Sequence, residues 1–438
     1  MAARATESPA ELLQELIRFD TTNPPGGEGP CLQRILEHFR ERGIEGRMLA
    51  GEAIRPNLVV RVPGRGEAPP LLLQGHVDVV TTLGQRWSRP PFAGDLVDGE
   101  IWGRGALDMK GGVAMMVAAL LRSLDERRPP AGDVVLACVA DEEAGGTYGA
   151  QYLAQQHREL FNGIRHGLGE GGGYRQSLAG RAFYPIMAAE KRACRLRMTF
   201  RGPGGHASRV HRGGTMAQLG RALVALDEAR LPVKVHPIVA RLVETIAANV
   251  EEPATSRFLQ LRDPARAEAA LEALGDDAET LDPILHDTVN ATIVRAGNKI
   301  NVIPAEAQLE LDGRVLPGVT AEQFLAEVRA VVGPDPEIEV TNEGPLGPEP
   351  VLDLFFELLS SVIEELERGA VPVPTILSGA TDARHFAPLG ITGYGYLPLN
   401  LPAGYGRNTV HNADERVPAA ALEFGTCALT AVLDRYRD

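Results

Sequence analysis

The alternation of hydrophobic and polar positions predicts helices and strands in turn over the first 190 residues. Ser8-Pro9-Ala10-Glu11 has the form of a capping box with proline at the first helical position, and apolar residues at helical spacing follow it. Residues 133–140 are almost all apolar, which is typical of a strand that is buried on both faces. The other expected elements are helices at about 30–42, 108–126 and 149–156 and strands at 57–62 and about 70–80.

The pattern changes near residue 190. Residues 195–201 (RLRMTFR) alternate polar and apolar positions, which predicts a sheet with one exposed face. A long polar, helical region follows, and further alternating strands and one helix lead to the linker at 344–350. We therefore expect a catalytic domain made of residues 1–190 and 345–438, with an α+β domain of residues 191–344 inserted into it.

The length of 438 residues supports this division, because a single core seldom keeps growing to that size. Strands that alternate with helices predict an α/β fold with an open sheet. In such sheets, ligand sites form beyond the carboxyl ends of the strands. Polar residues that follow the buried strands are therefore the first candidates for chemistry.

The charge and composition of the chain argue against some classes of binding partner. The formal net charge is −14, and no block of Lys or Arg offsets it, so neither nucleic acid nor an anionic membrane is an expected partner. The N-terminal residues lack the apolar core of a signal peptide, which favours a cytoplasmic protein. The four cysteines lie far apart in largely apolar surroundings and are expected to be buried free thiols.

The stretch from residue 71 to residue 110 carries the first candidate ligands. His76 and Asp78 are two residues apart, so an extended backbone points both side chains the same way. Asp108 comes directly after a Gly-Arg-Gly turn and before a helix. We predict that His76 and Asp108 bind metal and that Asp78 orients the imidazole through its second nitrogen. A chance His-x-Asp pattern and a helix N-cap at Asp108 remain the alternatives.

Three further acids and a second histidine fit the same site. Glu142 and Glu143 stand at the end of the buried strand, Glu170 lies in a glycine-rich loop, and His411 precedes the last predicted helix. The two imidazoles and three carboxylates of His76, Asp108, Glu143, Glu170 and His411 suit two zinc ions that share one carboxylate. Cobalt or manganese are possible substitutes.

Glu142 is next to a predicted ligand but is not itself predicted to bind metal. It could take the proton of a metal-bridging water and pass it to the leaving nitrogen of an amide. The alternative is a solvated surface acid.

These motifs resemble the dinuclear zinc peptidase and amidohydrolase family that includes aminoacylase, acetylornithine deacetylase, succinyl-diaminopimelate desuccinylase and glutamate carboxypeptidase. The resemblance covers nearly the whole chain. Its most specific pieces are GHVDVV, GRGALDMKGG, DEEAGG and GNKINVIPAEAQLELDGR.

The resemblance implies a three-layer αβα catalytic domain with an inserted ferredoxin-like lid, which forms a homodimer in many members. It implies that one zinc is held by His76, Asp108 and Glu170, and the other by Asp108, Glu143 and His411. Asp108 would then be the bridging ligand, Glu142 the general base and Asp78 the partner of His76.

The resemblance also implies substrate contacts. His206 looks like the family histidine that reaches a neighbouring active site to stabilise the oxyanion. Asn301 and Arg314 look like the pair that grips the substrate carboxylate. Two departures bear on the substrate: Gly379-Ala380-Thr381-Asp382 stands where the family often has Gly-Gly-Thr-Asp, and residues 236–287 form an unusually long lid segment.

The expected activity is hydrolysis of an amide bond beside a free carboxylate, in an N-acyl amino acid or a dipeptide. An exopeptidase that acts on longer peptides and a metal- or ligand-binding protein without catalysis are the alternatives. Glu142 counts against the last, because a binding protein needs no general base. The chain has neither a G-x-S-x-G elbow nor a phosphate-binding G-x-x-x-x-G-K-S/T loop.

Overall fold

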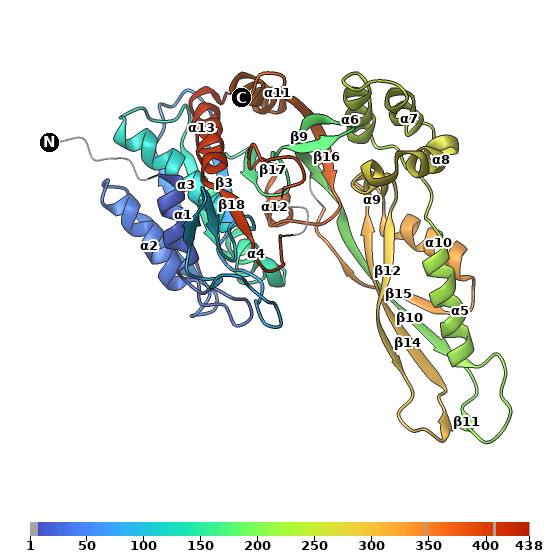
Figure 1. Cartoon of the computed structure of the whole chain (residues 1–438). Coiled ribbons are helices and arrows are strands. Elements are labelled where there is room, and N and C mark those ends of the chain that lie inside the picture. The colour runs from blue at the N-terminus through green and yellow to red at the C-terminus, as the bar shows by residue number, and fades with distance from the viewer. Residues whose placement is uncertain (1–7, 347, 406–408, 438) are drawn as a thin grey trace. The chain divides into compact units, whose positions relative to one another are not determined.

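The computed structural model of the chain describes residues 8–346, 348–405 and 409–437. The chain divides into two compact units, coloured by residue number in Figure 1. Unit 1 comprises Met1–Ala189, Pro350–Thr375 and Thr381–Asp438, and unit 2 comprises Glu190–Glu349 and Ile376–Ala380. Each unit has its own sheet and its own core, and each is described separately below.

The main sheet of unit 1 has nine strands among the described residues. Its spatial order is β1 (Gly46–Ala50), β2 (Pro56–Val62), β6 (Val134–Val139), β3 (Leu71–His76), β7 (His166–Gly169), β17 (Thr392–Gly395), β9 (Arg181–Glu190) and β16 (Val371–Leu377), with β8 (Gln176–Leu178) paired to β9. Strand β3 is parallel to β6 and β7, and β7 is parallel to β17. The carboxyl ends of β3, β6 and β7 therefore meet at one edge of the sheet.

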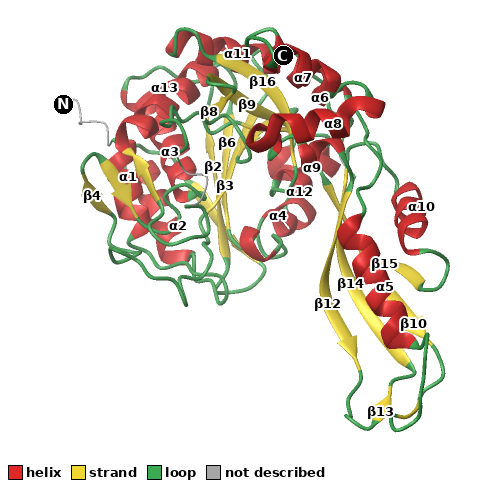
Figure 2. Cartoon of the chain, turned by 45° about the vertical axis from the view of Figure 1, so that its right-hand side comes forward, coloured by secondary structure: helices red, strands yellow, loops and turns green. Residues whose placement is uncertain are grey.

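Helices cover both faces of this sheet (Figure 2). Leu72 packs in one cluster with Leu153 of α4 (Ala150–Gln156). Gly75, three residues on and so on the opposite face of β3, lies against Val113 of α3 (Lys110–Asp125). The remaining helices are α1 (Pro9–Ile17), α2 (Gly29–Arg40), α11 (Leu354–Leu366), α12 (Ala383–Phe386) and α13 (Ala419–Arg435). The predicted three-layer α/β class is confirmed.

Local sequence signals explain where several elements begin. The Ser8 hydroxyl accepts a hydrogen bond from the Glu11 amide at 3.2 Å, and the Glu11 carboxylate accepts one from the Ser8 amide, which confirms the capping box of α1. Every residue of β3 and β6 is buried, as expected for central strands that are covered on both faces. A small separate sheet joins β4 (Asp95–Val97), β5 (Glu100–Trp102) and β18 (Arg416–Pro418).

Unit 2 contains a four-stranded antiparallel sheet in the order β12-β14-β10-β15. The chain order is β10 (Arg192–Arg201), α5 (Thr215–Glu228), β12 (Thr288–Ala296), β14 (Glu306–Val315), α10 (Ala321–Val332) and β15 (Glu337–Glu343). This βαββαβ order with that strand arrangement is ferredoxin-like. Burial along β14 alternates, and its buried face packs with Phe324 and Val328 of α10.

Two additions distinguish this ferredoxin-like unit. Short strands β11 (Gly205–His206) and β13 (Val302–Ile303) pair with each other, and four helices stand between α5 and β12. These helices are α6 (Pro237–Ala247), α7 (Ala254–Gln260), α8 (Pro264–Leu274) and α9 (Asp282–Leu285). The buried Lys191 ammonium donates to the carbonyl oxygens of Pro283 and His286, both at 2.9 Å, and so ties the end of this segment to the start of β10.

The structure corrects the predicted elements in two places. Strand β3 ends at His76, so Asp78 does not continue the extended strand that was expected to reach residue 80. The long strand β9 and its partner β16 were not predicted, and Pro185 in the middle of β9 argues locally against a strand there. In the part of the chain that the structure describes, no helix is long and apolar enough to cross a membrane. The cysteines are free, as predicted, with three of them buried and Cys427 partly exposed.

Because the two units have separate cores, a substitution that destabilises one unit should leave the stability of the other unchanged. Phe324 is fully buried in unit 2, so Phe324→Ala should destabilise that unit by about 3–5 kcal/mol. Native-state hydrogen exchange should then be faster for amides of β10 and β14, while amides of β3 and β6 keep their protection. An equal loss of protection in both units would show that they unfold as one body.

Candidate functional site

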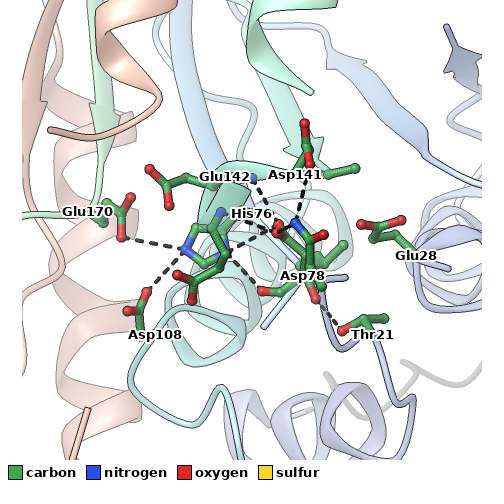
Figure 3. Close-up of polar contacts among 12 residues, drawn as sticks. Thr21, Glu28, His76, Asp78, Asp108, Asp141, Glu142 and Glu170 are labelled. Atoms are coloured by element: carbon green, nitrogen blue, oxygen red, sulfur yellow. Dashed lines mark hydrogen bonds and ion pairs between the residues drawn. The ribbon is translucent and has the colours of Figure 1, made fainter. Parts of the chain in front are cut away.

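Three parallel strands bring acidic residues to one edge of the sheet of unit 1. His76 is the last residue of β3, Asp141, Glu142 and Glu143 follow β6, and Glu170 follows β7. The register pairs His76 with Val139, so the ends of β3 and β6 are level. The sheet therefore places residues from distant segments beside the imidazole of His76 (Figure 3).

Asp108 lies between the two predicted ligand histidines. Its Oδ1 is 3.1 Å from His76 Nε2, and its Oδ2 is 3.0 Å from His411 Nε2. Each carboxylate oxygen thus contacts a different imidazole. This is the arrangement that a carboxylate needs in order to bridge two cations.

Glu170 and Glu143 complete the two groups. Glu170 Oε2 is 3.6 Å from His76 Nε2, and Glu143 Oε2 is 3.4 Å from His411 Nε2. The structure thereby forms two possible metal-binding groups, in each of which the ligand atoms lie within 4.8 Å of one another. Their members are His76, Asp108 and Glu170 in the first group and Asp108, Glu143 and His411 in the second.

The donor set fits divalent cations of the zinc class. Imidazole nitrogens and carboxylate oxygens are the ligands that zinc accepts. The second oxygen of Glu143, Oε1, is buried and has no hydrogen-bond partner among the described residues. A buried carboxylate oxygen without a partner is costly, and a bound cation would satisfy it.

The pKa values of the two histidines also indicate a site that favours cations. Hydrogen bonds to Asp108 and Glu143 raise the pKa of His411 to about 10. Burial alone would lower the pKa of His76, but the carboxylates of Asp108 and Glu170 outweigh it and raise the pKa well above its usual value. The excess of negative charge around the two imidazoles thus favours the binding of positive charge there.

Glu142 is oriented differently from the ligand acids. Burial, together with the nearby carboxylates of Asp382 and Glu170, raises the pKa of Glu142 to about 9. The Nη1 of Arg384 lies 3.5 Å from Glu142 Oε1. Glu142 belongs to neither metal-binding group. Its side chain therefore has no ligand role in either group and lies near His76 and Glu170 of the first group.

Asp78 contacts the Nδ1 of His76 more closely through its backbone than through its side chain. The Nδ1 of His76 is 2.9 Å from the backbone carbonyl oxygen of Asp78, whereas the Asp78 carboxylate is 3.6 Å away. That carboxylate instead accepts hydrogen bonds from the amides of Glu142 and Glu143, both at 3.2 Å, and from Asn23 Nδ2 at 2.8 Å. The backbone turn after His76 orients the imidazole, and the Asp78 side chain supports the loop of acids after β6.

A buried charged network behind Asp78 was missed by the sequence analysis. Asn23 also donates to Asp141 Oδ1 at 3.2 Å, and Arg55 Nη2 lies 3.1 Å from that same oxygen and 2.8 Å from Glu28 Oε1. Figure 3 shows Asp78, Asp141 and Glu28 side by side. No local pattern in the sequence marks Arg55 as a member of this network.

Unit 2 carries the three residues for which substrate contacts were predicted. His206 pairs with Val302 in the β11–β13 ladder, and the carbonyl oxygen of Asn301 accepts from Ala207, so His206 and Asn301 are neighbours. Arg314 lies at the other end of β14, roughly 26 Å of extended chain beyond Glu306. One chain therefore does not bring Asn301 and Arg314 together as a pair.

Arg314 and Thr381 have structural partners of their own. Arg314 Nε is 2.6 Å from Asp312 Oδ1, and its Nη2 is 3.1 Å from Asp312 Oδ2. Thr381 is buried, and its hydroxyl accepts from the Ala383 amide at 3.2 Å at the start of α12. A methyl group added at Gly379 would come no closer than 4.0 Å to Leu377, so this glycine is not required by packing. Gly406, Arg407 and Asn408, which precede His411, lie outside the described residues.

Comparison with known proteins assigns the family. The model of "Peptidase family M20/M25/M40" matches residues 72–435. The chain belongs to this family. The predicted resemblance is thus confirmed, and the chain is a hydrolase of the M20 family.

Curated relatives span most of the chain. Succinyl-diaminopimelate desuccinylase of Paracoccus denitrificans is 28% identical over 434 residues, which cover 98% of each chain. A probable carboxypeptidase S-like protein of Dictyostelium discoideum is 29% identical and covers 80% of this chain and 68% of its own length. The human N-fatty-acyl-amino acid synthase/hydrolase PM20D1 is 26% identical and covers 81% of this chain and 71% of its own length.

Solved structures share the fold. The M20 family metallo-carboxypeptidase Sso-CP2 of Sulfolobus solfataricus has a TM-score of 0.68 at 18% identity, with 98% of both chains covered. A dinuclear metal-binding M20 peptidase of Bacillus subtilis has a TM-score of 0.59 at 15% identity, with 97% of this chain and 96% of that chain covered. At these identities the likeness concerns the fold.

The reassignment of Asp78 can be tested by hydrogen exchange. Asp78→Ala removes the acceptor of two amides, which costs about 1–3 kcal/mol, so the amides of Glu142 and Glu143 should exchange roughly 5- to 150-fold faster. The matched control is Asp133→Ala, because the Asp133 carboxylate accepts from the Gly64 amide at 2.9 Å. That control should affect Gly64 alone. Unchanged exchange at 142 and 143 would restore the original assignment of Asp78 to His76.

Proposed function

We propose that this protein is a metal-dependent amidohydrolase that cleaves an amide bond beside a free carboxylate. The observation that carries the proposal is the position of Asp108, whose two oxygens contact His76 and His411 at 3.1 and 3.0 Å. The two groups that share Asp108 would hold two zinc ions per chain. Cobalt or manganese could replace zinc at such ligands.

In this proposal the ligands are His76, Asp108 and Glu170 for one ion and Asp108, Glu143 and His411 for the other. When bound, a pair of divalent cations would polarise the scissile carbonyl, acidify a water molecule and lower the pKa of neighbouring carboxylic acids. Glu142 would then accept the proton of the attacking water and deliver it to the leaving nitrogen.

The proposed substrate is an N-acyl amino acid or a dipeptide. Relatives named as a desuccinylase and as an N-fatty-acyl-amino acid hydrolase support an acylated amino acid. The relative named as a probable carboxypeptidase favours the second candidate, an exopeptidase that acts on longer peptides. Glu142, partly buried near His76 and Glu170, counts against a protein that only binds metal.

Unit 1 would be the catalytic domain and unit 2 a lid through which two chains dimerise. Strand β12 is an edge strand of unit 2, and Ile293 and Val294 on it are 46% and 50% exposed. An exposed apolar edge is available for pairing with another chain. A dimer would also let Asn301 and His206 of one chain serve a substrate held by Arg314 of the other. The cytoplasmic location expected from the sequence stays a prediction.

If Glu142 is the general base, its replacement should lower turnover without loss of bound zinc. Glu142→Gln keeps the shape of the side chain but cannot carry the proton, so kcat should fall about 10²- to 10⁴-fold. Zinc content, measured by plasma mass spectrometry, should stay at two ions per chain. Full turnover in a variant that retains its zinc would contradict the assignment.

Mixing two inactive variants tests whether His206 serves the partner's site. Glu142→Gln and His206→Ala change different units of the chain. If His206 acts across a dimer, a mixed dimer has one site with both changes and one intact site, so mixing after reversible dissociation should restore activity. If His206 acts within its own chain, every site keeps one change and the mixture stays inactive. Sedimentation velocity establishes that mixed dimers form.

A further inference from the structure

A buried ion pair connects the segments that carry Asp108 and His411. Arg104 and Glu415 are 1% and 0% exposed, and Arg104 Nη1 donates to Glu415 Oε2 at 2.6 Å. Arg104 comes four residues before Asp108, and Glu415 comes four residues after His411. The pair therefore joins two loops that are more than 300 residues apart in the sequence.

Glu415 fixes the backbone of the Asp108 loop. Its Oε1 accepts from the amides of Leu107 at 2.8 Å and Asp108 at 3.1 Å. Its Oε2 accepts from the amide of Gly105 at 3.0 Å, in addition to Arg104. A single buried carboxylate thus satisfies three backbone amides of one loop, and the last of these amides belongs to Asp108 itself.

Gln85 extends the connection to His411. Arg104 Nη2 donates to Gln85 Oε1 at 2.7 Å, and Gln85 Nε2 donates to the His411 carbonyl oxygen at 2.7 Å. The Trp87 indole also donates to Gln85 Oε1, at 3.1 Å. Because Arg104 and Trp87 can only donate, the oxygen of Gln85 must face them and its nitrogen must face His411.

We propose that Arg104, Glu415 and Gln85 are positioning residues that set the separation of Asp108 and His411 for one shared cation. This inference rests on the proposed function. The bonds run without a break from the His411 carbonyl through Gln85, Arg104 and Glu415 to the Asp108 amide. They hold the loop of His411, whose side chain is 52% exposed and therefore gains little from packing.

Substitutions at Gln85 and at Glu415 should affect the binding of the two metal ions differently. Gln85 touches the His411 loop, and His411 belongs to one metal-binding group only. Glu415 touches the Asp108 backbone, and Asp108 belongs to both groups. Loss of Gln85 should therefore weaken one of two bound ions, whereas loss of Glu415 should weaken both.

The test is a titration of the full-length, metal-free protein with Zn²⁺ by calorimetry. Gln85 is only half-buried, so Gln85→Leu should fold, and it should bind one zinc as the unaltered protein does and the other about 10- to 100-fold more weakly. Raising free zinc should restore its turnover, which a general loss of structure would not allow. The matched control is Gln14→Leu, because Gln14 Nε2 donates to the Gly94 carbonyl at 2.7 Å, away from both groups.

A second pair of variants probes the ion pair itself. Arg104→Lys keeps the buried charge but cannot reach Glu415 and Gln85 together, so it should weaken the same single zinc as Gln85→Leu. Arg42→Lys is its control, because Arg42 binds Asp125 at 2.8 and 2.9 Å in a buried pair elsewhere in unit 1.

The outcomes separate this inference from the proposed function. Two zinc ions in the unaltered protein, with Gln85→Leu and Arg104→Lys indistinguishable from their controls, would overturn the positioning role and leave the amidohydrolase proposal standing. Fewer than two zinc ions in the unaltered protein would overturn the proposed function and this inference with it.

Discussion

The site depends on one carboxylate that is shared between two imidazoles. Asp108 has one oxygen near His76 and the other near His411. The remaining candidate ligands, Glu170 and Glu143, each lie near one of these two imidazoles. This arrangement requires several segments of the chain to end close to Asp108. The parallel strands β3, β6 and β7 supply that point, because their carboxyl ends lie at the same edge of the sheet.

Gathering so many acids at one edge has an energetic cost, and the surrounding structure offsets it with specific partners. Arg55 neutralises Glu28 and Asp141, and backbone amides and Asn23 satisfy Asp78. Glu415 is balanced by Arg104 and by three amides. A buried charge without such partners would cost several kcal/mol. Glu143, one of the acids proposed to bind metal, has a buried oxygen without such a partner among the described residues.

Much of the fold was predictable because its signals are local. The capping box of α1 and the apolar run of β6 need only a few neighbouring residues to be recognised, and the strand ends then indicated that His76 and the acids after β6 would meet. The positions of Gln85, Arg55 and Glu415 were not predictable, because their bonds join segments far apart in the sequence and leave no repeating pattern. The separation of Asn301 from Arg314 was missed for the same reason: it is fixed by the register of β14 and not by spacing along the chain.

The insertion of unit 2 has a consequence for how the protein is made. The continuous part of unit 2 ends at Glu349, whereas His411 and Glu415 lie near the C-terminus. At about 5–20 residues per second, the ribosome needs roughly 5–18 s to deliver the last 89 residues after that point. During this interval the continuous part of unit 2 can fold while the acidic strand ends of unit 1 still await their final loop. A nascent chain that stalls there would carry a finished insert on an unfinished catalytic domain, which is a natural target for chaperones and proteases.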